Sequence, residues 1–417
     1  MRHHVMAAAA ALCLVAGSTA ASAQEKIRIG VMATLEGALT TLGEDGVRGA
    51  QVALKQAGGK LLGKDVELLF TSTNASPDSA LRAAKKLVEQ DKVSIIVGPL
   101  SGSEGIAIRD YSKTVPNVTF VNGSSGALET TYVTPSPTFF RYNLDGSQWM
   151  SGLGNYIFNE KKYKKIVTLA EDYSFPYTQI YGFALEYCQA GGQIANRLWV
   201  PLGTKDFGSI IASLPDDVDA IFLGLGGGDA VNFLNQYTQA GGKAKFIGGS
   251  IMVDQTVMSS KGSAKRALIG TPSAGPQADT WDDPKWQAWV KAYQDAFPAD
   301  KRFTGPSLSG TGYYNSVNAV FEAYKKVNGD LSDNHAKFRA ALASLELDAP
   351  NGKIKLDANR QAIGTNFVIE VVEAANGDLV SKLVKIVPNV NQTLGMDPAV
   401  FAKVGLPSRT NPECKKI

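Results

Sequence analysis

Two short segments rich in serine and glycine are the parts of this chain best suited to hold a ligand. Each follows an apolar run typical of a buried strand, and their candidate residues are Ser101, Gly102, Ser103, Asn122, Ser124 and Ser125. Backbone N–H groups and serine hydroxyls stabilise a carboxylate without supplying a full countercharge. Helix capping is the alternative role of Ser101 and Ser103, and capping is compatible with ligand contact. We expect both segments at one edge of a parallel sheet, where open α/β sheets bind ligands.

Aromatic side chains follow another strand-like run. Tyr173 and Phe175 stand beside Glu171 and Asp172, and rings next to polar groups are typical of the wall of an organic-ligand cleft. Packing in the core is the alternative, and we favour it for Tyr177. A glycine run from 224 to 228 resembles a phosphate-binding loop but lacks the third glycine of that motif. Both an anion-binding loop and a tight strand-to-helix turn stay open for this run.

Catalytic signatures are absent from the sequence. It contains no Walker loop, no Cys-x-x-Cys, no His-Glu-x-x-His and no Gly-x-Ser-x-Gly. Of its 3 histidines, His3 and His4 lie near the N-terminus, and His335 lies in a polar stretch at a predicted helix start. We expect His335 on the solvated surface, and one histidine cannot build a histidine-rich zinc site. The sequence therefore predicts no enzyme activity, no metal and no cofactor.

The first 23 residues are typical of a secretory signal peptide. Arg2 precedes an apolar run from Val5 to Ala16, and Ala21-Ser22-Ala23 forms the small-x-small cleavage pattern. The apolar run is too short for a permanent anchor, which needs about 20 apolar residues. We predict cleavage after Ala23 and export of a soluble chain. In an oxidising compartment, Cys188 and Cys414 can pair in a disulfide; the alternative for Cys188 is a buried free thiol.

Composition and periodicity predict an ordinary α/β protein. The chain has 417 residues, of which 44% are hydrophobic and 19% charged, and single cores stop growing at about 250–300 residues. A net charge of +3 is too small to indicate a nucleic-acid partner. Strand-like and helix-like runs alternate from residue 27 onward, which predicts doubly wound parallel sheets. The strands are expected at 27–32, 66–70, 93–97, 118–121, 166–170, 194–200, 220–223, 246–247, 366–372 and 380–387. The helices are expected at 44–57, 77–88, 103–113, 145–161, 176–190, 207–214, 229–240, 284–297, 312–327 and 335–345.

The order of these elements predicts two lobes joined by three crossovers. Lobe 1 is expected to comprise residues 24–142 and 277–350, and lobe 2 residues 143–272 and 366–387. Residues 351–365 form the third crossover, and residues 388–417 form a C-terminal tail. Several chain crossings that bend together act as a hinge rather than as a loose linker.

An ordered series of short motifs resembles the periplasmic solute-binding proteins of the branched-chain amino acid type. Quoted in order, the matching segments are Ile29-Gly30-Val31, Val97-Gly98-Pro99-Leu100-Ser101, Phe140-Arg141, Glu171-Asp172-Tyr173, Lys205-Asp206-Phe207, Asp219-Ala220-Ile221-Phe222 and Phe246-Ile247-Gly248. The resemblance implies the type I periplasmic binding fold, a periplasmic location, and capture of a small molecule by lobe closure. It also implies delivery to the permease subunits of an ABC importer, by a receptor that we expect to be a monomer.

The resemblance also transfers site positions to this chain. The family's carboxylate-binding loops fall at Ser101–Ser103 and at Ser124–Gly126, and an aromatic of the opposite lobe falls at Phe175. Where the family has two further aromatic residues, this chain has Leu42 and Gly226. The family's acid that binds the ligand ammonium falls at Ser250.

The missing acid bears on the ligand, because a desolvated ammonium without an anionic partner costs several kcal/mol. The sequence therefore favours an aromatic or similar hydrophobic carboxylate. The alternative is a neutral amino acid with Asp229 or Asp254 as its acidic partner. From other classes, an exported hydrolase that uses Ser124 and a sensor for a membrane kinase are further alternatives.

Overall fold

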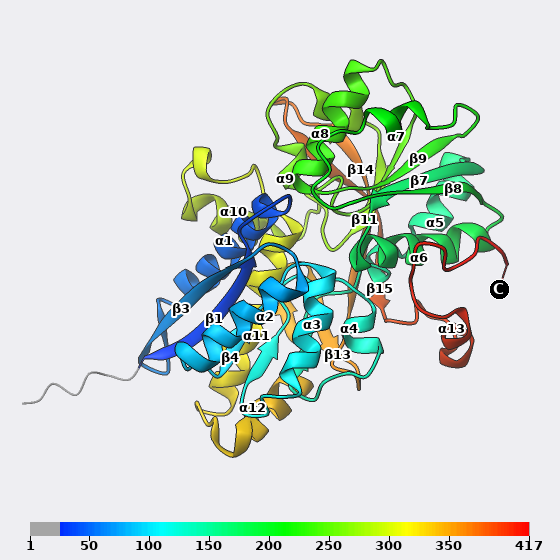
Figure 1. The fold of residues 1–417 in the computed structure, drawn as a ribbon. Coiled ribbons are helices and arrows are strands. Elements are labelled where there is room, and N and C mark those ends of the chain that lie inside the picture. The colour runs from blue at the N-terminus through cyan, green and yellow to red at the C-terminus, as the bar shows by residue number, and fades with distance from the viewer. Residues whose placement is uncertain (1–25, 417) are drawn as a thin grey trace, which may run out of the picture.

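Residues 26–416 are described by the computed structural model, in which two α/β lobes lie side by side (Figure 1). The predicted signal peptide lies outside these residues. In the first lobe, β1 pairs in parallel with β3 and β4, and β5 and β6 continue the sheet. Its strand order is β2 (Lys60–Leu61), β3 (Lys64–Thr73), β1 (Ile27–Thr34), β4 (Ile95–Val97), β5 (Thr119–Val121) and β6 (Phe139–Phe140).

Helices cover both faces of this first sheet. They are α1 (Thr40–Gln56), α2 (Pro77–Lys85), α3 (Gly102–Ser112), α4 (Glu129–Tyr132), α10 (Pro284–Ala296), α11 (Leu308–Lys326) and α12 (Ser332–Ser344). Four of them (α2, α3, α10 and α11) begin at a side-chain cap. Ser76 caps α2 ahead of Pro77, and Ser101 forms a capping box with Glu104 at the start of α3. These caps satisfy backbone donors that the first helical turn leaves free.

The second lobe combines a parallel core with antiparallel strands. Four parallel pairings join β7 to its neighbours and on to β11, whereas β14 pairs antiparallel with both β11 and β15. Its strand order is β12 (Leu347–Ala349), β13 (Gly352–Leu356), β14 (Ala362–Glu373), β11 (Pro272–Gly275), β10 (Phe246–Gly248), β9 (Ala220–Gly224), β7 (Lys165–Glu171) and β8 (Gln193–Val200), with β15 (Leu379–Val390) beside β14. The helices of this lobe are α5 (Leu153–Tyr156), α6 (Ser174–Gln189), α7 (Gly208–Ala212), α8 (Gly227–Gln239) and α9 (Gln255–Met258).

A buried polar network lies where the chain passes between the lobes. Arg141 is fully buried, donates to the side chain of Gln361 and lies 3.6 Å from Asp145. Gln361 in turn donates to Gln148, at 2.8 Å. Burial lowers the pKa of Arg141 to about 10, which leaves the guanidinium charged at neutral pH. The two contacts of Gln361 join residues more than 200 positions apart in the sequence, so the crossovers are packed against one another.

Three local expectations are wrong. A single helix over 145–161 is replaced by a short 3-10 turn at Gln148–Met150 and by α5, because Gly152 adopts a left-handed φ of 87° between them. The C-terminal tail, expected after the last strand without any element assigned to it, contains regular structure: β15 extends to Val390 and α13 follows (Pro398–Val404). Of the helices in the described part of the chain, none is long and apolar enough to cross a bilayer.

His335 is buried rather than solvated, at 4% exposure. Asp333, Asn334 and His335 have positive φ values of 49–66°, and this left-handed turn directs the imidazole inward. Its Nδ1 lies 2.9 Å from the hydroxyl of Thr119, at the start of β5. Burial, helped by the nearby charge of Arg339, lowers the pKa of His335 to about 4. The side chain is therefore a neutral part of the core.

Candidate functional site

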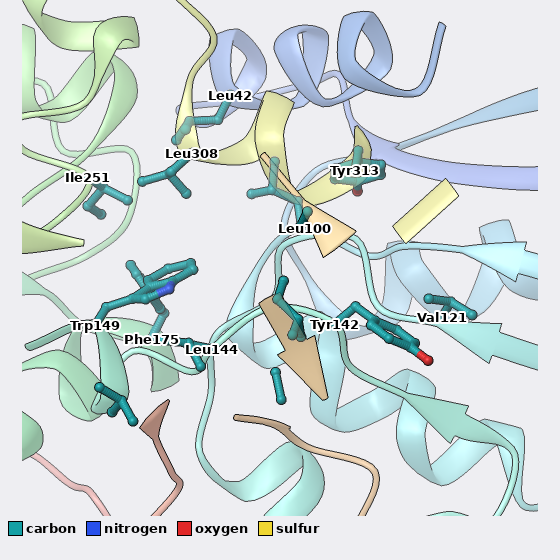
Figure 2. Close-up of a cluster of buried hydrophobic side chains, with 14 of the residues drawn as sticks. Leu42, Leu100, Val121, Tyr142, Leu144, Trp149, Phe175, Ile251, Leu308 and Tyr313 are labelled. Atoms are coloured by element: carbon teal, nitrogen blue, oxygen red, sulfur yellow. The ribbon is translucent and has the colours of Figure 1, made fainter. Parts of the chain in front are cut away.

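An apolar cavity lies between the two lobes, next to the loops that follow β4, β5 and β7. The centre of a water-sized sphere has about 20 Å³ of room inside it. Its lining residues are Leu39, Leu42, Leu100, Ser101, Gly102, Ser124, Trp149, Tyr173, Phe175, Ile251 and Leu308. Figure 2 shows leucines from the first lobe facing Ile251, Trp149 and Phe175. Of the described residues in this wall, none carries a formal charge.

The loop after β4 leaves two backbone donors free beside this cavity. The Ser101 hydroxyl donates to the carbonyl of Ala75 at 2.8 Å, and the Ser101 N–H donates to Glu104 at 2.9 Å. Ser101 therefore acts as a helix cap. By contrast, the N–H groups of Gly102 and Ser103, in the first turn of the eleven-residue helix α3, have no acceptor among residues 26–416. Together with the helix dipole, these two donors can stabilise an anion.

The loop after β5 differs from expectation. The N–H groups of Ser124 and Ser125 are not free, because both donate to the carbonyl of Pro99, at 3.1 and 3.3 Å. Ser124 lines the cavity, and its hydroxyl lies 3.2 Å from that of Ser309. Ser125 and Asn122 are buried behind the loop: the Ser125 hydroxyl packs against Gly105, and the Asn122 amide donates to the Ser125 carbonyl at 3.0 Å.

The aromatic wall is centred on Phe175, which lies among three glycines. A Cβ added at Gly102 would lie 3.1 Å from the Phe175 Cβ, and one at Gly126 would lie 2.7 Å from two carbons of its ring. A Cβ at Gly146 would come within 3.1 Å of the same ring. Trp149 meets the ring edge-on with centroids 5.6 Å apart. The ring of Phe175 thus fits where these glycines have no side chains.

Tyr173 is the second predicted aromatic in the wall. Burial, together with the charges of Glu171 and Asp229, raises the pKa of its hydroxyl well above the ordinary range. Tyr173 therefore lines the cavity as a neutral phenol. Its ring centroid lies 6.4 Å from that of Phe175.

Ser103, Gly226 and Ser250 lie near the cavity but outside its wall. Ser103 reaches across the lobes, with its hydroxyl 3.1 Å from that of Ser174. The Gly226 N–H donates to Glu171 at 2.9 Å. Ser250 lines a neighbouring cavity with Asp254 and accepts a hydrogen bond from Gln179 at 2.6 Å.

The two acids considered as ammonium partners are already engaged. Asp229 accepts the N–H of Gly203 at 2.7 Å, and Asp254 accepts the N–H of Leu308 at 2.8 Å. The second of these bonds crosses between the lobes. Burial raises the pKa of Asp254 to about 7. Neither carboxylate is among the residues that line the apolar cavity.

The glycine run after β9 makes a lobe-to-lobe contact and forms a tight turn. Gly227 has a φ of 49°, and a Cβ there would lie 2.3 Å from the carbonyl oxygen of Ala38. The next N–H, that of Gly228, donates to the same carbonyl at 3.0 Å. Because Ala38 belongs to the first lobe, this donor helps to hold the lobes together.

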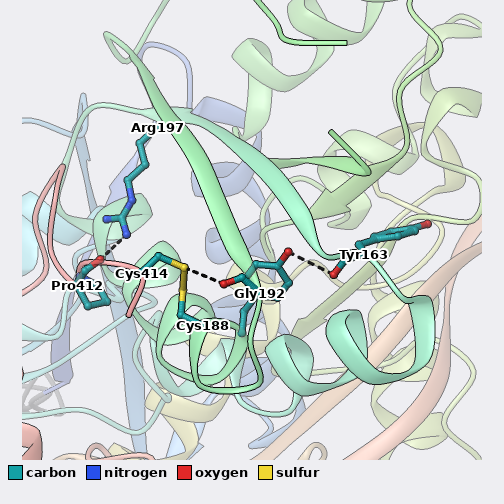
Figure 3. The surroundings of a disulfide bond; sticks show 7 residues. Tyr163, Cys188, Gly192, Arg197, Pro412 and Cys414 are labelled. Carbon is teal, nitrogen blue, oxygen red and sulfur yellow. Dashed lines mark hydrogen bonds between the residues drawn. A yellow bond between two sulfur atoms is a disulfide. The ribbon is translucent and has the colours of Figure 1, made fainter. Parts of the chain in front are cut away.

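The predicted disulfide is present. Cys188 of α6 is bonded to Cys414 of the tail, and Arg197 donates to the carbonyl of Pro412 beside it (Figure 3). No group of three potential metal ligands comes together within residues 26–416. The Ser124 hydroxyl has a serine beside it, whereas the one histidine of this part of the chain bonds Thr119.

Sequence reasoning missed five lining residues: Leu39, Leu100, Trp149, Ile251 and Leu308. Leu100 stands next to the predicted Ser101 and could have been found from that position. The other four carry no local signal, since an apolar side chain in a loop looks the same whether it faces a core or a ligand.

Comparison with known proteins agrees with this arrangement. The sequence profile of the family described as periplasmic binding protein matches residues 26–378, and the chain belongs to this family. Leu/Ile/Val-binding protein homolog 6 of Brucella melitensis is 22% identical over 378 residues, which cover 89% of this chain and 94% of that protein. Leu/Ile/Val-binding protein homolog 2 of Brucella abortus is 25% identical and covers 78% of this chain and 86% of its own length.

Two solved structures share the fold. A solute-binding protein of an ABC transporter from Rhodopseudomonas palustris BisB5, in complex with 3,4-dihydroxybenzoic acid, has a TM-score of 0.80 at 23% identity and covers 88% of this chain and 98% of that one. The branched-chain amino acid transporter substrate-binding protein LivJ from Streptococcus pneumoniae, in complex with isoleucine, has a TM-score of 0.71 at 22% identity and covers 87% and 100%.

Proposed function

We propose that this chain is the periplasmic receptor of an ABC importer and that it captures a small aromatic carboxylate between its lobes. The observation that carries the proposal is the cavity itself: apolar walls from both lobes, no charged side chain among its described lining residues, and two unpaired N–H groups at the start of α3. Small-molecule sites typically combine apolar walls with a few convergent polar groups.

The carboxylate is assigned to the N–H groups of Gly102 and Ser103 and to the hydroxyl of Ser124. These donors stabilise a negative charge and leave no positive side chain buried when the site is empty. The ring is assigned to the space between Leu42 of the first lobe and Trp149 and Phe175 opposite. Edge-to-face and offset contacts with such rings favour an aromatic ligand over an aliphatic one of similar size.

An amino acid ligand is less compatible with this wall. Its ammonium would lose water and find no carboxylate at the cavity surface, because Asp229 and Asp254 accept backbone N–H groups elsewhere. That desolvation costs several kcal/mol. A branched-chain or other neutral amino acid remains the competing ligand class, and it is supported by the names of the Brucella relatives.

Capture follows from the contacts between the lobes. A ligand that touches both lobes binds the closed form more tightly than the open form and so increases the closed population. Three hydrogen bonds between the lobes add to the contacts that the ligand makes with both of them. They join Ser103 to Ser174, Gly228 to Ala38 and Leu308 to Asp254. We propose that the permease subunits recognise this closed shape.

The test is a titration of purified, ligand-stripped protein. Isothermal calorimetry should detect binding of benzoate, 4-hydroxybenzoate or 3,4-dihydroxybenzoate and none of leucine, isoleucine or valine. Benzamide, which keeps the ring and loses the charge, is the ligand-side control and should not bind. Binding of leucine with no binding of the benzoates would reject the aromatic class.

A matched pair of variants locates the site. Ser124→Ala should weaken benzoate binding about tenfold, the usual loss for one hydrogen bond to a charged group. Ser213→Ala, which removes an exposed hydroxyl that bonds the carbonyl of Ile210, should leave binding unchanged. Recovery of the benzoate unaltered after long incubation distinguishes a receptor from a hydrolase.

Export is tested separately. N-terminal sequencing of protein from a periplasmic extract should begin at Gln24, as cleavage after Ala23 predicts. Retention of the full-length chain in the cytoplasm would reject this part of the proposal.

A further inference from the structure

The C-terminal strap, residues 391–416, connects the crossover region to the loop that carries the aromatic wall. Figure 1 shows it leaving β15, forming α13 and running back along α6. Its contacts lie outside the ligand cavity. They nevertheless involve both lobes, which distinguishes the strap from a tail that lies on one surface.

At its far end the strap is fixed to the second lobe. Arg409 forms a two-pronged hydrogen-bonded ion pair with Asp172, with its Nε 2.7 Å from Oδ1. The hydroxyl of Tyr177 donates to the same carboxylate. Although partial burial acts to raise it, the bonds from Arg409 and Tyr177 lower the pKa of Asp172 below its usual value. The disulfide from Cys414 to α6 ties down the chain a few residues further on.

At its near end the strap contacts the first lobe and the crossover. The Gln392 side-chain amide donates to Thr131 at 3.0 Å and to Asp145 at 2.9 Å. The ring of Phe401 is buried between Tyr132, which precedes β6, and Tyr181 of α6, with centroid distances of 5.5 and 5.8 Å. Phe401 therefore packs between residues of the two lobes.

Arg409 binds next to two residues that line the cavity. Asp172 directly precedes Tyr173, and Phe175 follows three positions after Asp172, as the second residue of α6. The ring of Phe175 fits among glycines with little spare room, since a single added Cβ would lie 2.7 Å from it. Movement of this segment would therefore also move the ring that packs against Gly126.

We propose that Arg409 is a positioning residue for ligand capture: through Asp172, the C-terminal strap holds the loop with Tyr173 and Phe175 in the conformation that closes onto the first lobe. This inference rests on the proposed binding of a ligand in the cavity. Arg409 acts through Asp172 and does not contact the ligand itself. The Cys188–Cys414 bond keeps the strap close enough for the ion pair to form.

The test compares two charge-removing variants of the same strap. Arg409→Gln breaks the pair with Asp172, whereas Lys415→Gln removes a charge that pairs with Glu413. In the unliganded protein, amide hydrogen exchange of residues 172–177 should become faster in Arg409→Gln and stay unchanged in Lys415→Gln. The dissociation constant for benzoate should rise about fivefold in Arg409→Gln, mainly through faster release.

Two further measurements separate positioning from stability. The melting temperature of unliganded Arg409→Gln should stay close to wild type, because the arginine side chain is largely exposed. The double variant Cys188→Ser, Cys414→Ser should weaken benzoate binding in the same direction. A lower melting temperature with unchanged benzoate affinity would overturn the proposal, as would unchanged exchange of 172–177.

Ligand binding by the wild-type protein tests the proposed function independently of the strap. If wild-type protein binds neither benzoate nor isoleucine, the function proposed above is rejected. Hydrogen exchange of residues 172–177 then still tests the positioning role of the strap. Faster exchange in Arg409→Gln alone supports that role, and equal exchange in both variants overturns it.

Discussion

Replacing Gly126 with alanine should impair lobe closure while leaving each lobe folded. Gly126 belongs to the loop after β5 in the first lobe, and Phe175 belongs to the second. A Cβ at position 126 would lie 2.7 Å from two ring carbons of Phe175, whereas ordinary contact begins at about 3.4 Å. The ring cannot easily retreat, because Trp149 and Gly146 bound it elsewhere.

The magnitude follows from the cost of overpacking. Adding a methyl group to a filled site typically costs about 1–3 kcal/mol. Because 1.4 kcal/mol is a factor of ten in affinity, the dissociation constant should rise about 5- to 150-fold. The open form should be destabilised little, since Phe175 moves away from Gly126 when the lobes separate. The backbone at 126 is not left-handed, so alanine adds no backbone strain.

Calorimetry with benzoate and thermal melting without ligand measure the two effects. We expect weak binding and a nearly unchanged melting temperature for Gly126→Ala. Gly208→Ala, at an exposed position whose added Cβ would meet only the side chain of Asp206 at 3.2 Å, is the control and should bind normally. In a Phe175→Leu background, Gly126→Ala should cost much less, because the clashing ring is gone. Wild-type affinity in the single variant Gly126→Ala would refute the assigned closure contact.

Three further predictions concern stability. Arg141→Met leaves the buried carboxylate of Asp145 without its cation, so urea unfolding should show a loss of about 3–5 kcal/mol; a loss below 1 kcal/mol would contradict the buried-network interpretation. Because the folded pKa of His335 is lowered to about 4, its contribution to stability is complete above its unfolded value near 6.5 and is lost as pH falls toward 4. As pH falls from 6.5 to 4, the free energy of unfolding should therefore decrease more steeply for the wild type than for His335→Gln. Parallel curves of unfolding free energy against pH would contradict this prediction. Replacing Cys188 and Cys414 with serine opens a loop of 226 residues, and the chain-entropy relation predicts a loss of about 5 kcal/mol; an unchanged urea midpoint would show that the bond contributes nothing.

Most of the elements could be predicted from local pattern. Alternating strand and helix signals, with turns such as that at Gly377, placed the sheets of both lobes and the final hairpin. Signals of this kind depend on residues close together in the chain. The errors fell where a distant contact overrides local preference: Gly152 breaks the expected helix, and His335 turns inward to Thr119.

The candidate site was predicted in part. Of the residues expected to bind the ligand, Leu42, Ser101, Gly102, Ser124, Tyr173 and Phe175 line the cavity. Asn122 and Ser125 lie behind it, because a loop exposes only some of its side chains to one face. The division into lobes at residues 142 and 277, the monomeric state and the signal peptide stay predictions.

The sequence by itself determined the fold class and the serine-rich loops at strand ends, and it left open whether Cys188 and Cys414 pair. Those features depend on residue type and on spacing along a few turns of chain. Only the tertiary structure decided which donors remain free, that Phe175 meets three glycines from elsewhere in the chain, and that Arg409 reaches Asp172 across 237 positions. Such contacts are set by how the lobes and the tail pack, and packing between distant segments has no local signature.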